Sequence, residues 1–174
     1  MTFSLSHAAF PSIETTLNAL SANLDKGEAY AAAKKIDASV LLQTRIAPDM
    51  FPLTRQVLIA CDVAKNGLSR LAGVEAPKFE DNETTVAQLK ERIAKTVAFI
   101  KTLDRAKIDA SVAADITFPT GQTSKGVMKG GDYLTMFILP NVHFHAATAY
   151  GILRHCGVEV GKKDFLGAIP MTAA

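Results

Sequence analysis

The 174-residue sequence has no tryptophan, only two cysteines and no long apolar run. Cys61 and Cys156 lie far apart, without a CxxC or a Cys/His ligand pattern, so neither a disulfide framework nor a zinc knuckle is indicated. No apolar stretch approaches the ~20 residues that span a bilayer, and the first residues lack the regions of a signal peptide. We therefore expect a cytoplasmic protein that is neither secreted nor embedded in a membrane.

An excess of charge of one sign is also missing. The chain has 19 basic and 17 acidic side chains, and no segment concentrates lysine or arginine as a phosphate-binding surface would. Nucleic acid is therefore not expected as a partner. Apolar residues make up 48% of the sequence and charged residues 21%, which is ordinary globular composition and argues against disorder. We expect residues 1–174 to form one domain, because this length suffices to bury one core.

Short catalytic motifs are absent as well. The glycines form no GxxxxGK[ST] phosphate loop, and there is no nucleophile elbow, HExxH or kinase motif. Any chemistry has to be sought in individual side chains and in their placement on the predicted elements.

The dominant pattern that is present is a helical one. Apolar residues recur at spacings of three and four, which predicts long helices over residues 3–24, 52–72, 84–103 and 131–157. Pro11 is expected to kink the first helix or to mark its start, and the helix-forming residues after Gly27 are expected to make separate connecting turns. Pro52 suits the first turn of the second helix, and Gly73 suits its end.

Residues 108–128 differ from the rest of the chain in being rich in β-branched side chains. Two such runs flank the turn sequence PTGQ, which predicts a small hairpin of two short strands before the last helix. Pro140 is expected to kink or split that last helix, and Phe165 with Leu166 is expected to pack back on the bundle. The fold class is therefore all-α with one short hairpin.

The last helix carries polar side chains on two opposite faces, because each residue advances by about 100°. One set is Asn141, His145 and Thr148. The other set is His143, Tyr150 and Arg154. We interpret the first set as a candidate pocket wall and the second as a candidate homodimer surface. A lone helical histidine is more often a hydrogen-bonded structural residue than a ligand, and this alternative stays open for both histidines.

Asp62 is a second candidate, because it lies inside the apolar run VLIACDVA. A buried carboxylate needs a partner or an altered pKa, and either need is typical of a pocket residue. The alternative is a pairing with Arg55, seven positions earlier, or a solvated position. Tyr30 and Arg55 are weaker pocket candidates, since residues near helix ends commonly serve in capping or packing.

Several segments together resemble one branch of the DinB/YfiT-like superfamily, whose members are largely of unknown function. The segments are PDMFP at 48–52, RQVLIACDVAK at 55–65, PNVHFH at 140–145 and TAYGILRHCGVEVGKKDFLG at 148–167. The resemblance covers essentially the whole chain. It implies an up-and-down four-helix bundle, with short connecting helices and a pocket at one end.

The resemblance also implies a candidate metal site. Many members hold a divalent metal on three histidines, one from the second helix and two spaced four apart on the last helix. Matching the LRxxG endings puts Asn141 and His145 at the paired positions, and the IACDVA segment puts Asp62 near the remaining one. Only one histidine of the three is kept. Asp62 and His145 are therefore the candidate ligands for zinc or nickel, and binding should be weak because an amide is a poor ligand for both.

Three functions follow from these patterns. The favoured one is a small-molecule-binding bundle with an end-of-bundle pocket that has lost its three-histidine metal centre and is lined by Asp62, Asn141 and His145. The second is a metal- or thiol-dependent enzyme, of transferase or isomerase type, in which Asp62 and His145 hold a metal or share a proton. The third is a structural or interaction homodimer that uses the face of His143, Tyr150 and Arg154.

Overall fold

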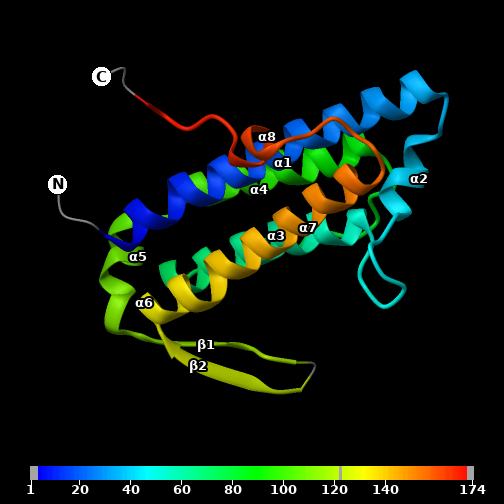
Figure 1. Ribbon diagram of the computed structural model, residues 1–174. Coiled ribbons are helices and arrows are strands. Elements are labelled where there is room, and N and C mark those ends of the chain that lie inside the picture. The colour runs from blue at the N-terminus through cyan, green and yellow to red at the C-terminus, as the bar shows by residue number, and fades with distance from the viewer. Residues whose placement is uncertain (1–3, 122, 172–174) are drawn as a thin grey trace.

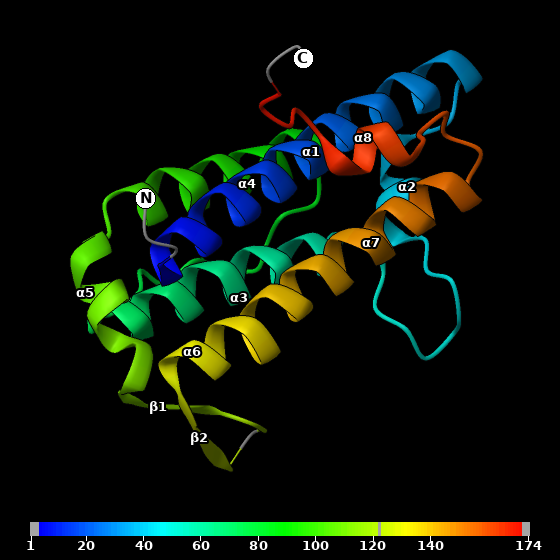
Figure 2. The same ribbon diagram turned by 60° about the vertical axis from the view of Figure 1, so that its left-hand side comes forward.

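The computed structural model describes residues 4–121 and 123–171 and is built around long helices that pack side by side (Figure 1). The long helices are α1 (Leu5–Lys34), α3 (Leu53–Ala72), α4 (Val86–Lys101) and α7 (Leu139–His155). Helix α3 packs against α4 and α7, and α1 packs against the same two helices (Figure 2). The predicted all-α class, with a bundle of long helices and one short hairpin, is confirmed.

Short elements connect or extend this bundle. They are α2 (Ala38–Gln43), α5 (Arg105–Ala110), a 3₁₀ turn (Ser111–Ala113), α6 (Gly130–Asp132) and α8 (Lys162–Leu166). Helix α8 packs on α1, and the ring of Phe165 lies 5.9 Å from that of Tyr150 on α7. Leu166, in contrast, is 40% exposed, so only the first member of the predicted pair packs against an aromatic ring of the bundle. None of the helices in the described ranges combines the length and apolar character that a bilayer crossing requires.

The first helix is longer than its periodicity predicts. Helix α1 begins before Pro11, passes through Gly27 and ends only at Lys34, so the expected break after Gly27 is wrong. A Cβ atom at Gly27 would lie 2.9 Å from the side chain of Leu153. The glycine therefore serves the close approach of α1 to α7 and does not end the helix.

The boundaries of the two middle helices agree with the sequence. Pro52 is the N-cap of α3, and Gly73 ends this helix in the left-handed region, with φ at 68°. Helix α4 begins with a capping box, in which the Thr85 hydroxyl accepts from the backbone of Gln88 and the Gln88 side chain accepts from the backbone of Thr85.

The predicted hairpin is present as β1 (Asp115–Pro119) and β2 (Lys125–Lys129), which pair antiparallel with Ile116 opposite Met128. The run ASVAA before it folds instead as the end of α5 and the 3₁₀ turn. On β1, Phe118 lies with its ring 4.6 Å from the rings of both Tyr133 and Phe137. These aromatic contacts fasten the hairpin to the start of the last helix.

Pro140 neither breaks nor ends the last helix. The chain passes from α6 through a π-helical turn, Tyr133–Ile138, directly into α7, with Pro140 near the start of α7. Proline has no backbone N–H, so a wider turn before it accommodates the missing hydrogen bond. The side-chain amide of Asn141 donates to the carbonyl of Phe137 at 2.7 Å and satisfies an acceptor at this junction.

Candidate functional site

Asp62 lies in a charged cluster between α3 and α4. Its carboxylate is 2.9 Å from Nη2 of Arg92 and 3.3 Å from Nζ of Lys65. The side chains of these two cations are 2% and 4% exposed, respectively. Buried cations require nearby carboxylates, so the charge of Asp62 is already neutralised inside the protein.

Two further acids complete this cluster. Arg92 also lies 3.1 Å from Asp81 and 2.9 Å from Glu83, and Arg55 pairs with Asp81. Burial alone would raise the pKa of Asp81, but hydrogen bonds from Arg55 and Arg92, together with their charges, lower it below its ordinary value. Arg55 therefore pairs with an acid of the loop and not with Asp62.

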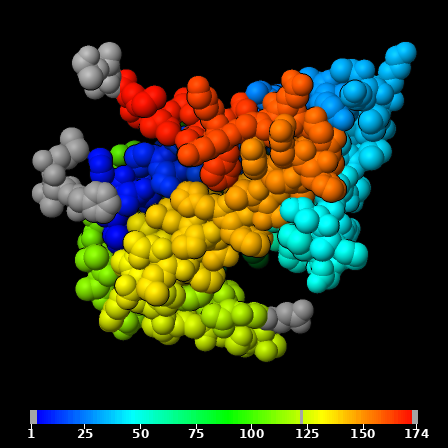
Figure 3. Space-filling model, in the orientation of Figure 1, coloured from blue at the N-terminus to red at the C-terminus, as the bar shows by residue number. Residues whose placement is uncertain are grey.

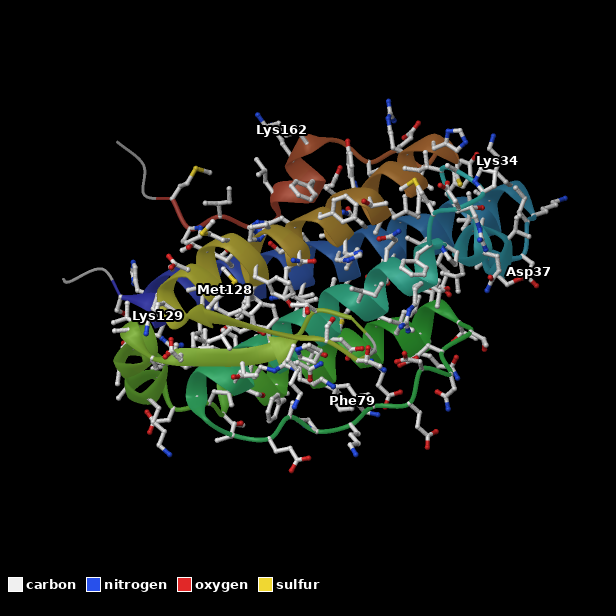
Figure 4. The ribbon with its side chains drawn as sticks, turned by 90° about the horizontal axis from the view of Figure 1, so that it is seen from below. Lys34, Asp37, Phe79, Met128, Lys129 and Lys162 are labelled. Carbon is white, nitrogen blue, oxygen red and sulfur yellow. The ribbon has the colours of Figure 1, made fainter. Side chains whose placement is uncertain are left out.

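The segment between α3 and α4, residues 74–85, is held on the bundle by the same cations, and we call it the strap. Lys65 donates to the carbonyl of Pro77 at 2.7 Å. The centre of the Phe79 ring lies 4.3 Å from Nζ of Lys65 and 4.9 Å from the guanidinium carbon of Arg92. Figure 4 shows the strap running beside α3 and α4, with Phe79 on it. The Asp62 cluster thus fixes a loop to two helices.

His145 lies in a different environment, at the packing interface of α3 and α7. It is 9% exposed, and its Nδ1 lies 2.7 Å from the side-chain oxygen of Gln56. The amide nitrogen of Gln56 donates to the carbonyl of Phe51 at 3.0 Å. Because a carbonyl can only accept, this second bond orients the Gln56 amide with its oxygen toward His145.

The orientation of Gln56 sets the tautomer of His145. An amide oxygen accepts, so Nδ1 of the imidazole carries the proton and Nε2 keeps a lone pair. Burial lowers the pKa of His145, and the nearby charge of Arg55 lowers it further, so the ring is neutral near neutral pH. Within the described part of the chain Nε2 has no hydrogen-bond partner. The site therefore presents a rigidly held acceptor.

The structure separates Asp62 from this acceptor. Asp62 and Gln56 are six positions apart on α3, which puts them on different sides of the helix and about 9 Å apart along its axis. Gln56 faces His145 on α7, whereas Asp62 faces Arg92 on α4. The residue of α3 that sequence reasoning missed is thus Gln56, and its polar side chain inside the buried stripe of α3 was the available signal.

The other candidates on α7 have local partners. Asn141 lies one turn before His145, but its amide nitrogen is used by the Phe137 carbonyl. The hydroxyl of Thr148 donates to the carbonyl of Phe144 at 2.8 Å. Both side chains therefore donate hydrogen bonds to their own helix. The side-chain oxygen of Asn141 takes no part in its bond, so it is the atom of these two residues that could accept a hydrogen bond from a ligand.

The opposite face of α7 contacts other parts of the same chain. His143 lies 3.2 Å from the hydroxyl of Ser12 on α1, and Tyr150 packs against Phe165. Arg154 is exposed. Tyr30 lies apart from His145, in a pocket of about 580 Å³ between the ends of α1 and α7, next to Gly157. The homodimer stays a prediction.

The comparisons with known proteins identify the family. The family model of a domain of unknown function, DUF1993, matches residues 5–166. The chain belongs to this family. It is also similar to the crystal structure of a DinB family member protein from Shewanella denitrificans, with a TM-score of 0.90, 44% sequence identity, and coverage of 98% of this chain and 96% of that chain. The resemblance to the DinB-like superfamily is therefore confirmed. Comparison with curated proteins gave no match.

The side chains of this DUF1993 protein do not fit a three-histidine metal centre. Around His145 the neighbouring donors are the amides of Gln56 and Asn141, and the Gln56 oxygen already accepts from the imidazole. Amides bind zinc and nickel poorly. Among residues 4–121 and 123–171, no three His, Cys, Asp or Glu side chains are placed to hold a metal ion.

The cysteines of this DUF1993 protein add little chemistry. Cys61 is fully buried, and burial raises the pKa of its thiol to about 12, despite the nearby Thr96 hydroxyl and the charge of Arg92. A thiol with such a pKa stays protonated near neutral pH and is not a nucleophile. A thiol-dependent reaction would therefore need a thiol other than that of Cys61; the second free cysteine, Cys156, is half-buried at the C-terminal end of α7.

The lowered pKa of His145 makes a prediction about stability. At His145 the unfolded chain binds a proton more readily than the folded chain. The free energy of unfolding is therefore highest above pH ~6.5, the ordinary pKa of histidine, and it falls as the pH drops from there to the lower pKa of the folded state. Urea unfolding of the wild type should therefore show falling stability below that pH. The double variant Gln56→Leu/His145→Leu, which removes both partners of the hydrogen bond, should lose less stability on acidification. Equal losses in the two proteins would contradict the neutral, buried histidine.

Proposed function

We propose that this DUF1993 protein binds a small molecule at the His145 site, without a three-histidine metal centre. The observation that carries the proposal is the 2.7 Å hydrogen bond between Gln56 and His145, both buried. It holds a neutral imidazole with Nε2 available as an acceptor. His145 is 9% exposed and its Nε2 is not sealed from the surface, so this acceptor is open to a ligand that donates a hydrogen bond.

The surroundings of His145 support a ligand with an apolar body. The ring of Phe144 stands edge-on to the imidazole at 5.2 Å, and Phe144 and Phe51 are 58% and 55% exposed, respectively. Figure 3 shows the surface hollowed between the segment after α2, in cyan, and the hairpin, in yellow-green, beside α7. Exposed aromatic side chains next to a fixed polar group are typical of small-molecule sites.

An enzyme is the second candidate, and the same lone pair favours it. Nε2 of His145 would accept the proton of a thiol from a second molecule, because Cys61 is buried and protonated. The thiolate of that molecule would then attack an electrophilic carbon of the substrate, and the leaving group would depart with the electron pair of the bond that breaks. Ligand binding at His145 is common to both functions, so it is the property to test first.

Ligand binding is tested with phenol and anisole, which share a ring but differ in the hydroxyl donor. Phenol should bind the wild type about fivefold more tightly than anisole, the effect of about one hydrogen bond. In the double variant Gln56→Leu/His145→Leu the preference should vanish. Titrations followed by two-dimensional NMR give both affinities and locate the shifts on α3 and α7. An equal preference in both proteins, or no binding of either probe, would contradict the proposal.

The loss of the metal centre is tested by rebuilding it. Wild-type protein purified without a tag or chelator should hold no stoichiometric metal after exposure to zinc, nickel or manganese. The double variant Gln56→His/Asn141→His supplies three imidazoles with His145 and should bind about one zinc ion per chain. The matched control Asp62→His/Asn141→His should not, since Asp62 faces α4.

Elemental analysis distinguishes the outcomes of this test. Zinc in the wild type that is lost on His145→Ala substitution would favour the metalloenzyme. Zinc in the Asp62→His/Asn141→His variant but not in the Gln56→His/Asn141→His variant would mean that the ancestral site lies on the other side of α3.

A further inference from the structure

Another pocket, of about 530 Å³, lies between α3 and the strap. Its walls come from the outer side of α3 and from the strap residues that run back along this helix after Gly73. It is separate from the His145 site, because it borders the Asp62 side of α3. The volume lies within the range of small-molecule sites.

The charges in this pocket are not evenly matched. Asp62 and Asp81 are already paired with the buried cluster and with Arg55. Arg70 and Lys78, which also line the pocket, form no ion pair within the described ranges. The remaining acid is Glu75, so the unpaired charges leave an excess of one positive charge. This excess favours an anionic ligand.

Two side chains at the α3 wall point to the same ligand class. The hydroxyl of Ser69 is buried, with 1% exposure of the residue, and has no hydrogen-bond partner within the described chain. Arg70 donates through Nη1 to the hydroxyl of the buried Tyr133 at 3.1 Å, which fixes its guanidinium and leaves other N–H groups for a ligand. A buried hydroxyl without a partner is costly unless something supplies one.

We propose that this pocket binds a small molecule with an anionic oxygen group, a carboxylate or a phosphate, on an apolar body. Arg70 and Ser69 donate to the anionic oxygens, and Asn66, the neighbouring polar side chain of the wall, donates its amide. Val74 and Pro77 on the strap contact the apolar part. Arginine suits both anions, because its planar fork matches the geometry of either group.

The test is an NMR titration of the wild-type protein with benzoate, with inorganic phosphate and with benzylamine as a cation of similar shape. We expect benzoate or phosphate to shift the resonances of residues 66–79 and benzylamine not to do so. Binding of benzoate would assign the pocket to carboxylates with an apolar body, and binding of phosphate alone would assign it to phosphates. Absence of binding by both anions, or equal binding by benzylamine, would overturn the proposal.

Variants link the binding to the named side chains. Arg70→Met should lower the affinity for the anion about tenfold, because it removes a charge-assisted hydrogen bond. The matched control Arg154→Met removes the same charge from an exposed site on α7 and should leave the affinity unchanged. Because Arg70→Met also strips Tyr133 of its partner, Ser69→Ala provides a second variant. Ser69→Ala should leave the stability of the protein unchanged or raise it, since it removes an unpartnered hydroxyl. It should lower the affinity for the anion roughly fivefold. Unchanged affinity in both pocket variants would overturn the proposal.

Discussion

A buried hydrogen bond between Gln56 on α3 and His145 on α7 is the interaction on which the proposed site depends. It crosses the interface between two helices that pack side by side in the bundle. Both side chains are buried, so little water can compete for this hydrogen bond. The carbonyl of Phe51 orients the amide, the amide selects the imidazole tautomer, and burial keeps the ring neutral. Each step constrains the next, so one short segment before α3 fixes the chemistry of a side chain on α7.

Helix α3 thus supports two polar arrangements with different purposes. On one side, Arg92 and Lys65 are buried with carboxylates around them, and their charges are used to hold the strap. On the other side, Gln56 forms a neutral, hydrogen-bonded pair with His145 on α7. Burying cations requires nearby acids, whereas burying a neutral His145 requires only a single acceptor. The same helix therefore combines a charged anchor for the strap with an uncharged hydrogen-bonded pair.

Much of the fold could be predicted from the sequence, because helical periodicity and capping are local. The caps at Pro52 and Gly73 and the hairpin around PTGQ follow from a few neighbouring residues. The break after Gly27 could not be judged locally, since its cause is the approach of Leu153 from a distant helix. For the candidate site, the placement of single residues could be predicted but their pairing could not. Periodicity puts Gln56 within the buried stripe and Asp62 on a different side of α3, but the pairing with His145 joins residues 89 positions apart, which no local pattern specifies.

Membership in the DUF1993 family gives the bundle and not the reaction, since one fold hosts many functions. The central claim is physical: Gln56 holds His145 neutral, with the proton on Nδ1. Long-range ¹H–¹⁵N correlation spectra of the imidazole rings, recorded near neutral pH, test it most directly. We predict that His145 shows a protonated Nδ1 and an unprotonated Nε2, and that this signature disappears in Gln56→Leu. An imidazolium, or the opposite tautomer with the proton on Nε2, would contradict the account.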